Sequence, residues 1–337
     1  MGIGNHSDIQ SNLFARVTEL LPAHLSLADE LASLLGVSRD SAYRRLRGDT
    51  ELSLTEAAMI CQRFGLSLDH LIGPSSGAVQ FQRDGTGDLD MEGRLGVVNA
   101  FLKQMEQASS KEIVYFSMEL PFFHILQVPE LLAFKRCYWE SVLRPDEPLP
   151  KVHLGTPTSP ELALEIVGRY IRIPSTEIIY ESALSTTLHQ VLYFLESGCF
   201  TDPNDALRVY DALRALVVHL KAQASLGRKF RYGAPAPEQG PADNYRLFLN
   251  EMVYSQNIIH TRLDGKEAVF LEHNVIQFMQ TTDPEFCRET SATLATIQGK
   301  SIPISAVSER ERNKFFNRLE ASIERMRSRA EILIAGN

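Results

Sequence analysis

ADELASLLGVSRDSAYRRLRG, residues 28–48, contains two short amphipathic segments that meet at a glycine. Ala32 precedes Gly36 by four residues; a small residue lets two helices approach closely, and a glycine allows the left-handed backbone of a tight turn. Ser38 suits the N-cap of the second segment because its side-chain oxygen can accept a free amide hydrogen. The stretch therefore predicts two helices joined by a tight turn.

The same arrangement of a serine followed by helical apolar spacing recurs throughout residues 1–73. Five serines each precede such a segment: Ser7, Ser26, Ser38, Ser53 and Ser67. Ser7 with Gln10, and Ser53 with Glu56, also have the spacing of a capping box. We therefore expect a compact domain of five short helices in this part of the chain.

From residue 25 to residue 73, LSLADELASLLGVSRDSAYRRLRGDTELSLTEAAMICQRFGLSLDHLIG resembles the lambda repressor and Cro type of helix-turn-helix, the XRE family. The Ala-x-x-x-Gly turn, the glycine after the second helix and the closing LSLDHLIG carry this resemblance. It implies a transcriptional regulator that binds double-stranded DNA as a homodimer, with the second helix in the major groove. The chain departs from the family at Arg45, where an apolar residue is usual.

On a helix that begins at Arg39, Ala42 and Leu46 face the core of the domain, and most of the polar side chains face outward. Arginine can donate two hydrogen bonds to guanine, Asp40 can accept from cytosine or support the helix N-terminus, and Tyr43 suits a phosphate or a thymine methyl group. We expect Arg45 to point sideways, towards a phosphate. The predicted DNA interface comprises Ser38, Arg39, Asp40, Tyr43, Arg44, Arg45 and Arg47.

The positive charge of this domain is concentrated on that one segment. Residues 38–48 carry four arginines and one aspartate, whereas residues 1–73 as a whole carry six arginines and nine acidic residues. Such focus favours a specific DNA site over charge-driven binding, because nonspecific affinity scales with the number of phosphates neutralised. An ordinary solvated helix face, or a related fold used only for protein contacts, are the alternatives.

The overall length, composition and charge are those of an ordinary globular protein. Its 337 residues carry a formal charge of −8, which excludes a whole-surface coat for nucleic acid. The cysteines lie far apart and are predicted to be reduced thiols: Cys61, Cys137, Cys199 and Cys287. The N-terminus lacks the features of a signal peptide and no run is long enough to span a membrane, so we expect a cytoplasmic protein without membrane contact.

After the helical domain, residues 74–94 are rich in Gly, Ser and Asp and predict a flexible linker. Residues 95–337 mix helical and strand patterns, which predicts a helix-rich α+β domain for dimerisation and sensing. The runs EIVYFSM (112–118) and TEIIYES (176–182) predict strands, and Asp264-Gly265 predicts the turn of a hairpin. Residues 233–243 predict a surface loop. FSMELP and PELLAFKRCYW are similar to the C-terminal parts of large bacterial regulators with a Cro-type DNA-binding domain.

The last predicted helix carries a heptad-like apolar series. Phe315, Leu319, Ile323, Met326, Ala330 and Leu333 recur at spacings of three and four residues, after a capping box at Ser308 and Glu311. Such a series is typical of a helix that pairs with its twin in a homodimer. Docking of the helix on its own domain explains the series equally well.

The sequence predicts no catalytic or metal site and no cofactor. HExxH, GxSxG and GxGxxG are all absent, and Gly299-Lys300-Ser301 lacks the earlier glycine of a phosphate loop. His260, His273 and Glu272 could flank a pocket, although structural histidines are commoner. An enzyme of unknown reaction, with the helix-turn-helix used for autoregulation or docking to DNA, is the alternative function.

A small-molecule effector is the remaining predicted partner. Its candidate pocket is an aromatic cluster that core packing would also explain, and Glu119, Lys135 and Arg136 are the nearby polar candidates. The aromatic members are Phe122, Phe123, Phe134, Tyr138 and Trp139.

Overall fold

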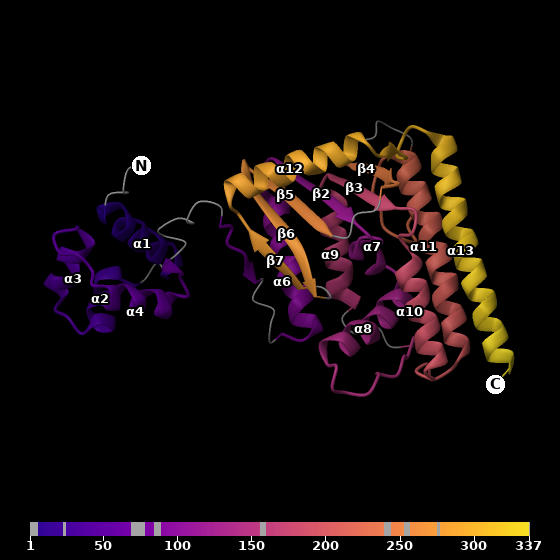
Figure 1. Ribbon diagram of the computed structural model, residues 1–337, viewed down its shortest axis with the longest axis horizontal. Coiled ribbons are helices and arrows are strands. Elements are labelled where there is room, and N and C mark those ends of the chain that lie inside the picture. Colours follow the sequence, from indigo (N-terminus) through magenta and orange to yellow (C-terminus); the bar gives the residue numbers. More distant parts are fainter. Residues whose placement is uncertain are drawn as a thin grey trace. The chain divides into compact units, whose positions relative to one another are not determined.

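The computed structural model describes residues 6–22, 25–68, 78–83, 89–155, 160–238, 244–252, 257–274 and 277–336. The chain forms two compact units that divide between residues 80 and 81 (Figure 1). Each unit is built around its own apolar core.

The smaller unit is helical. Its described helices are α1 (His6–Leu20), α2 (Leu27–Leu35), α3 (Arg39–Leu46) and α4 (Leu54–Phe64). They enclose a single core of buried side chains: Leu13, Phe14, Val17, Leu31, Ala42, Ile60 and Cys61. The predicted fifth helix, residues 67–73, falls mostly outside the described residues, so a five-helix domain stays a prediction.

The turns between these helices follow the local signals of the sequence. Gly36 ends α2 with a left-handed φ of 65°, as the tight turn requires. The Ser38 side chain accepts a hydrogen bond of 3.2 Å from the Ser41 amide, which confirms the predicted cap of α3. Ser53 and Glu56 form the predicted capping box at the start of α4.

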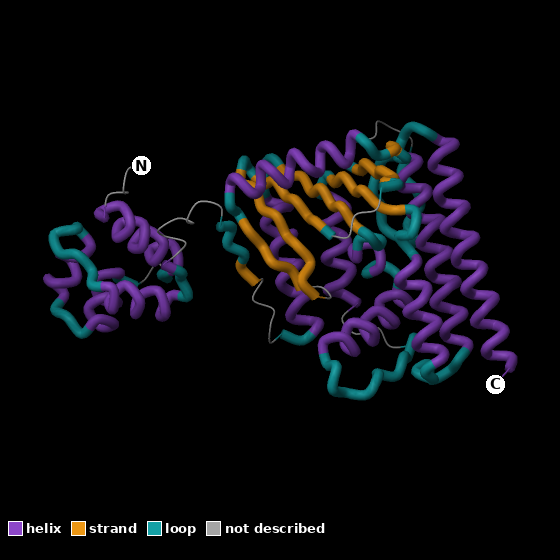
Figure 2. Tube along the Cα trace, in the orientation of Figure 1, coloured by secondary structure: helices purple, strands orange, loops and turns teal. Residues whose placement is uncertain are grey.

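The larger unit contains a mixed sheet of eight strands in its described part (Figure 2). The strand order is β1-β7-β6-β5-β2-β3-β4-β8. Neighbouring pairs β2–β3 and β3–β4 are parallel, and the other pairs are antiparallel. The strands are β1 (Gln82–Arg83), β2 (Lys111–Ser117), β3 (Ser175–Tyr180), β4 (Tyr245–Asn250), β5 (Ile258–Leu263), β6 (Lys266–Asn274), β7 (Gln277–Thr281) and β8 (Ile302–Pro303).

Helices cover both faces of this sheet (Figures 1 and 2). On one face, Leu294 and Ile297 of α12 (Pro284–Gly299) pack against Phe116 and Ile178. On the other face lie α6 (Met91–Gln107), α7 (Phe122–Ile125) and α9 (Pro160–Arg172). Beyond β4, a bundle is formed by α8 (Pro129–Leu143), α10 (Ser185–Glu196), α11 (Asn204–Leu226) and α13 (Glu309–Gly336). The larger unit is therefore a helix-rich α+β fold, as predicted.

The predicted linker, residues 74–94, is wrong in its second half. Gln82 and Arg83 form β1 and pair with β7 at the edge of the sheet. Asp90 caps α6, accepting a hydrogen bond of 2.8 Å from the Gly93 amide. The Gly and Asp content suggested a tether, but Gln82 and Arg83 belong to an edge strand, where pairing with a distant strand decides the structure, and Asp90 belongs to a helix start.

The predicted strands and hairpin are confirmed. Both EIVYFSM and TEIIYES supply parallel strands of the sheet, and β3 is buried along its whole length. Asp264 and Gly265 join β5 to β6 with φ values of 47° and 80°, as a two-residue hairpin turn requires. The sequence reasoning missed β4, whose run YRLFLN follows a Pro-rich segment, as well as β7 and the edge strands β1 and β8.

The apolar series of the last helix faces the protein's own core. Phe315, Leu319, Ile323 and Ala330 are each at most 2% exposed, and α13 packs along α11 and α10. The alternative of docking on its own domain therefore holds, and this series is not free to pair with a second copy.

A buried carboxylate connects the middle of the sheet to its surroundings. Glu177 on β3 is 1% exposed, and both its oxygens lie within 2.9 Å of His124 Nε2 on α7. The hydroxyl groups of Tyr170 and Tyr245 also donate to this carboxylate. Because these groups stabilise the charged form, they hold the pKa of Glu177 below its ordinary value despite the opposing effect of burial.

Lys229 is the cation of the same network. Its ammonium group donates to the carbonyls of Tyr170 and Ile173 at 2.8 and 2.6 Å and to Ser175 Oγ at 2.9 Å. It also lies 3.8 Å from the centroid of the Tyr170 ring. The network thus joins β3, β4, α7, α9 and the segment after α11.

We expect Glu177→Ala to lower the free energy of unfolding of the larger unit by about 3–5 kcal/mol, because three buried donors lose their acceptor and Lys229 loses a nearby opposite charge. Urea unfolding followed by circular dichroism measures the change. As a control, Glu165→Ala removes an exposed carboxylate that pairs with Arg169, and it should have a much smaller effect. Equal effects of the two substitutions would contradict the role given to Glu177.

Lys229 also makes stability depend on pH. Burial lowers the pKa of its ammonium group from 10.5 to about 7, and the charge of Glu177 limits the shift. Between these two pH values the unfolded chain binds more protons than the folded one, so this group makes the free energy of unfolding rise with pH. We expect a slope of at most about 1.4 kcal/mol per pH unit in urea unfolding between pH 7 and 9, and a flatter profile for Lys229→Met. A variant profile as steep as that of the parent would exclude this assignment.

Candidate nucleic-acid interface

Helix α3 lies against the smaller unit through one side only. Ala42 is fully buried and Leu46 packs against the same core, as predicted from their spacing of four residues. The opposite side is exposed and carries most of the predicted contact residues: Arg39, Asp40, Tyr43, Arg44 and Arg47. The orientation of this helix predicted from its amphipathic pattern is therefore correct.

Two of the exposed arginines have local partners. Arg39 Nε lies 2.8 Å from Asp29 of α2, and its guanidinium group lies 5.8 Å from the centroid of the Tyr43 ring. Arg47 Nε lies 2.9 Å from Asp49. All four side chains of these ion pairs are more than half exposed, so both pairs are weak and can be exchanged for other anions.

Arg44 differs because it has no ion-pair partner within the described ranges, and it is exposed. It therefore contributes an uncompensated positive charge to the outer face of α3.

The prediction that Arg45 reaches sideways to a phosphate is corrected by its surroundings. Its side chain is 13% exposed, and Nη2 lies 2.7 Å from Glu56 of α4. Nη1 donates to the hydroxyl and carbonyl oxygens of Ser41 at 2.7 and 3.2 Å. Arg45 therefore places its charge against the carboxylate of Glu56, within the smaller unit.

Glu56 links this ion pair to the capping box. Its second oxygen accepts a hydrogen bond of 2.8 Å from the Ser53 amide. This bond and the guanidinium group of Arg45 together lower the pKa of Glu56 below its ordinary value. The pair therefore connects α3 to the start of α4.

Gln10 holds the far end of α3. Its side-chain amide donates to the carbonyls of Arg45 and Thr50 at 2.7 and 3.0 Å and accepts from the Leu52 amide at 2.9 Å. Both polar groups of this side chain therefore serve residues 45–52, and the Ser7 side chain of the predicted capping box lies outside the described part of the structure. Only the packing of α1 beside this segment identifies that role.

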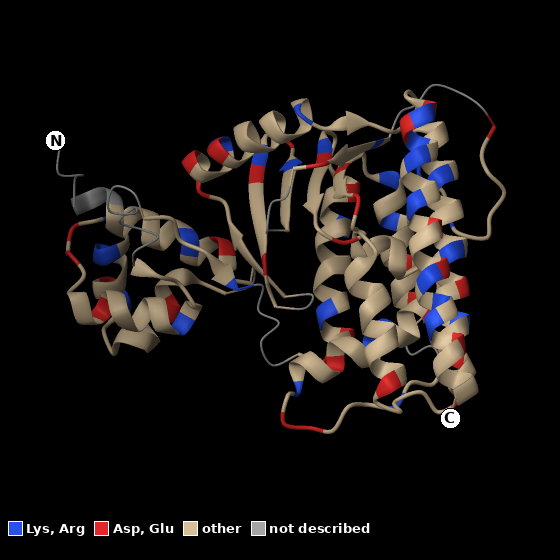
Figure 3. Cartoon of the chain, turned by 45° about the vertical axis from the view of Figure 1, so that its right-hand side comes forward, with Lys and Arg blue, Asp and Glu red and all other residues tan. Residues whose placement is uncertain are grey.

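A second cationic surface runs along α13 (Figure 3). Half of its six arginines are matched by carboxylates on neighbouring elements. Arg318 pairs with Glu181, Arg327 with Asp211 and Arg329 with Glu196. These pairs attach α13 to its own domain.

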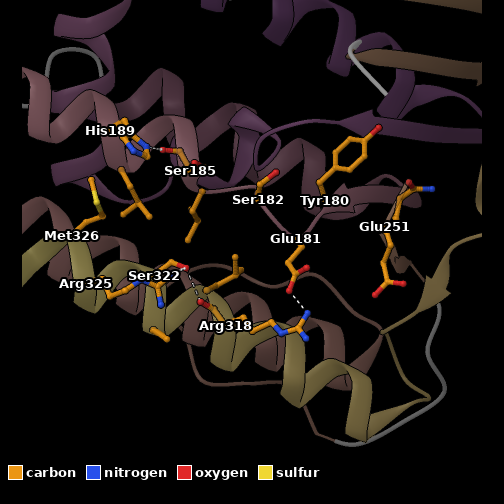
Figure 4. A pocket seen from close by; sticks show the side chains of 15 residues that line it. Tyr180, Glu181, Ser182, Ser185, His189, Glu251, Arg318, Ser322, Arg325 and Met326 are labelled. Atoms are coloured by element: carbon orange, nitrogen blue, oxygen red, sulfur yellow. Dashed lines mark hydrogen bonds and ion pairs between the residues drawn. The ribbon is translucent and has the colours of Figure 1, made fainter. Parts of the chain in front are cut away.

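A cavity of about 760 Å³ lies at the carboxyl ends of β3 and β4, between α10 and α13. Figure 4 shows Glu181 and Arg318 pointing towards each other, His189 beside Ser185 of α10, and Arg325 beside Ser322 of α13. Ligands of open α/β sheets commonly bind outside the carboxyl ends of parallel strands. This position was not predicted, because its residues come from segments that are distant in sequence.

A smaller cavity of about 130 Å³ lies beyond the carboxyl end of β2. Its polar lining residues are Ser117, Glu119, Lys135, Asn257 and Glu272. Its aromatic lining residues include Phe122, Tyr138 and Trp139 of the predicted cluster, joined by Tyr115 and Phe278. The predicted polar candidates Glu119 and Lys135 therefore lie where the aromatic cluster forms a cavity.

Other members of the predicted pocket lie elsewhere. Phe134 is fully buried against Phe194 and Phe200 in the helical bundle. Phe123 stacks on Tyr170 at 4.1 Å between ring centroids. Arg136 lines a separate surface cleft. Successive residues of α8 point in different directions, so a cluster in the sequence divides between the core and the cavity.

The structure also places the histidines that were predicted to flank a pocket. His260 is buried 3.5 Å from Glu267 and His273 is exposed, and neither lines the smaller cavity. The cysteines are free thiols, as predicted. No cluster of three or more metal-binding side chains occurs in the part of the chain that the structure describes. Among the described helices, none is both long and apolar enough to cross a membrane.

Comparisons with models of protein families, with curated proteins and with solved structures gave no match to this chain.

The roles of Arg45 and Arg44 can be separated by hydrogen exchange on the full chain. We expect Arg45→Ala to weaken protection of the α3 and α4 amides by about 1–3 kcal/mol, since Glu56 would lose a mostly buried cation. Arg44→Ala should change protection by less than about 0.5 kcal/mol because its side chain is exposed. Similar protection in both variants would show that the Arg45–Glu56 pair does not support α3.

Proposed function

We propose that this protein is a sequence-specific DNA-binding transcriptional regulator. The observation that supports this proposal most directly is the exposure of Arg39, Tyr43, Arg44 and Arg47 on one face of a helix whose opposite face is buried. A recognition helix presents such a face to the major groove, where arginine donates to guanine O6 and N7.

The arrangement around α3 supports a rigid DNA-binding element. Ser38 caps its start, Gln10 binds the segment at its end, and Arg45 ties its middle to α4. Preorganised side chains lose less conformational entropy on binding. At the N-terminus of α3, Ser38 suits a phosphate contact and Asp40 suits a hydrogen bond from cytosine.

In this proposal the larger unit supplies the dimer contact and the ligand sensor that a single DNA-binding domain lacks. Regulators with one such domain per chain commonly bind as dimers, with two recognition helices about 34 Å apart along the duplex. We propose that residues 81–337 provide the dimer contact and a sensor for a small molecule. Binding of that molecule would alter the placement of the two DNA-binding domains and thereby the affinity for DNA.

The test begins with selection of DNA fragments that the purified full chain binds, followed by gel-shift titration. We expect Arg44→Ala and Arg47→Ala each to weaken binding to the selected site by about 1–3 kcal/mol, which is roughly 5- to 150-fold. Arg16→Ala is the matched control, because it removes an exposed arginine of α1 with the same change in net charge. The proposal fails if both α3 variants shift DNA as well as the parent does.

A further inference from the structure

The smaller cavity of the larger unit has an unbalanced charge. Two carboxylates, Glu119 and Glu272, line it together with one cation, Lys135. Lys135 Nζ lies 3.3 Å from Glu119 and donates at 2.8 Å to Gln190, so its charge is engaged with Glu119. Glu272 accepts from Asn257 and forms no ion pair among the described residues, and the charge of Lys135 acts on it only from a longer distance. The cavity therefore retains one uncompensated carboxylate.

The environment of Glu272 makes this negative charge costly. The Glu272 side chain is exposed to solvent at this cavity. The protein atoms around its carboxyl group nevertheless raise the pKa above its ordinary value, and the nearby charge of Glu119 adds to the rise. A cationic ligand would stabilise the charged form that these neighbours disfavour.

The walls of the cavity suit a cation with an apolar part. Tyr138 and Trp139 of α8 and Phe122 of α7 supply aromatic surface, and the ammonium group of Lys135 lies 5.4 Å from the centroid of the Tyr138 ring. Aromatic rings attract ammonium groups through their quadrupoles. The cavity therefore contains one ammonium–aromatic contact of the chain's own.

An apolar pocket of about 70 Å³ adjoins the cavity. Phe122 and Phe278 line both spaces, and the pocket exposes no polar surface. A ligand whose charged end contacts Glu272 can thus place a short hydrocarbon chain against these two rings.

The cavity of about 760 Å³ shown in Figure 4 offers weaker selectivity for a ligand. Its Arg318 already pairs with Glu181, and most of its charged side chains are exposed to water. Lys135, by contrast, is only 3% exposed, which marks the smaller cavity as a built site rather than a gap between surface side chains.

We propose that the smaller cavity binds a small organic ammonium ligand with a short apolar chain, whose cationic group lies beside Glu272 and Glu119. Its use as the effector of DNA binding rests on the proposed function, whereas the binding itself does not.

The experiment uses the full chain without DNA and three probes of matched size: n-butylammonium, n-butyrate and n-butanol. Trp139 lines the cavity and is the chain's one tryptophan, so its fluorescence reports occupancy. We expect a saturable change with n-butylammonium, with a dissociation constant on the order of millimolar for so small a probe. An equal or larger saturable response to butyrate or butanol would overturn the proposal.

Glu272→Gln removes the charge while keeping the shape, and it should weaken n-butylammonium binding about tenfold or more. Glu289→Gln on α12 is the matched control, because this exposed residue lies outside the cavity, and it should bind like the parent. Unchanged affinity of Glu272→Gln would refute the assignment. If that variant does not fold, the comparison of the three probes on the parent chain decides alone.

The gel shift repeated with saturating n-butylammonium separates the two proposals. A shift in DNA affinity supports the effector role. Unchanged DNA affinity with intact ligand binding rejects that role and leaves both the ligand site and the DNA-binding helix standing.

Discussion

The buried carboxylate of Glu177 is the interaction on which the larger unit depends. A charge in the middle of a sheet is tolerated only when nearby groups replace the water it has lost. Three donors from three elements do so here: His124 of α7, Tyr170 of α9 and Tyr245 of β4. Since each donor must reach the same two oxygens, the network restricts how these elements can pack on β3.

This restriction extends to the smaller cavity. α7 follows directly on the carboxyl end of β2, and His124 anchors it to Glu177. Phe122, two residues earlier, then forms a wall that both the cavity and the adjoining apolar pocket share. The two carboxylates differ in how their charge is stabilised. Glu177 is surrounded by hydrogen-bond donors of the protein, whereas the charge of Glu272 is left for a ligand to balance.

In the smaller unit, by contrast, the residue pattern of α3 itself indicates which face of the helix is buried. The burial of Ala42 and the cap at Ser38 turn the arginine-rich face outward. The exception is Arg45, whose pair with Glu56 substitutes for an apolar contact. One arginine of the cationic segment is therefore structural, and Arg39, Arg44 and Arg47 remain for an external partner.

Local patterns in the sequence determined the helices of the smaller unit, the turn at Gly36, the exposed face of α3, the strands β2 and β3 and the hairpin at Asp264-Gly265. Each of these depends on residues a few positions apart, so spacing and turn chemistry are enough to predict them. Only the tertiary structure decided the role of Arg45, the docking of α13 on its own domain, the pairing of β1 within the predicted linker and the cavity around Glu272. These features join residues that are distant in the chain, and whether a charge is balanced or a face is covered depends on which elements meet in space.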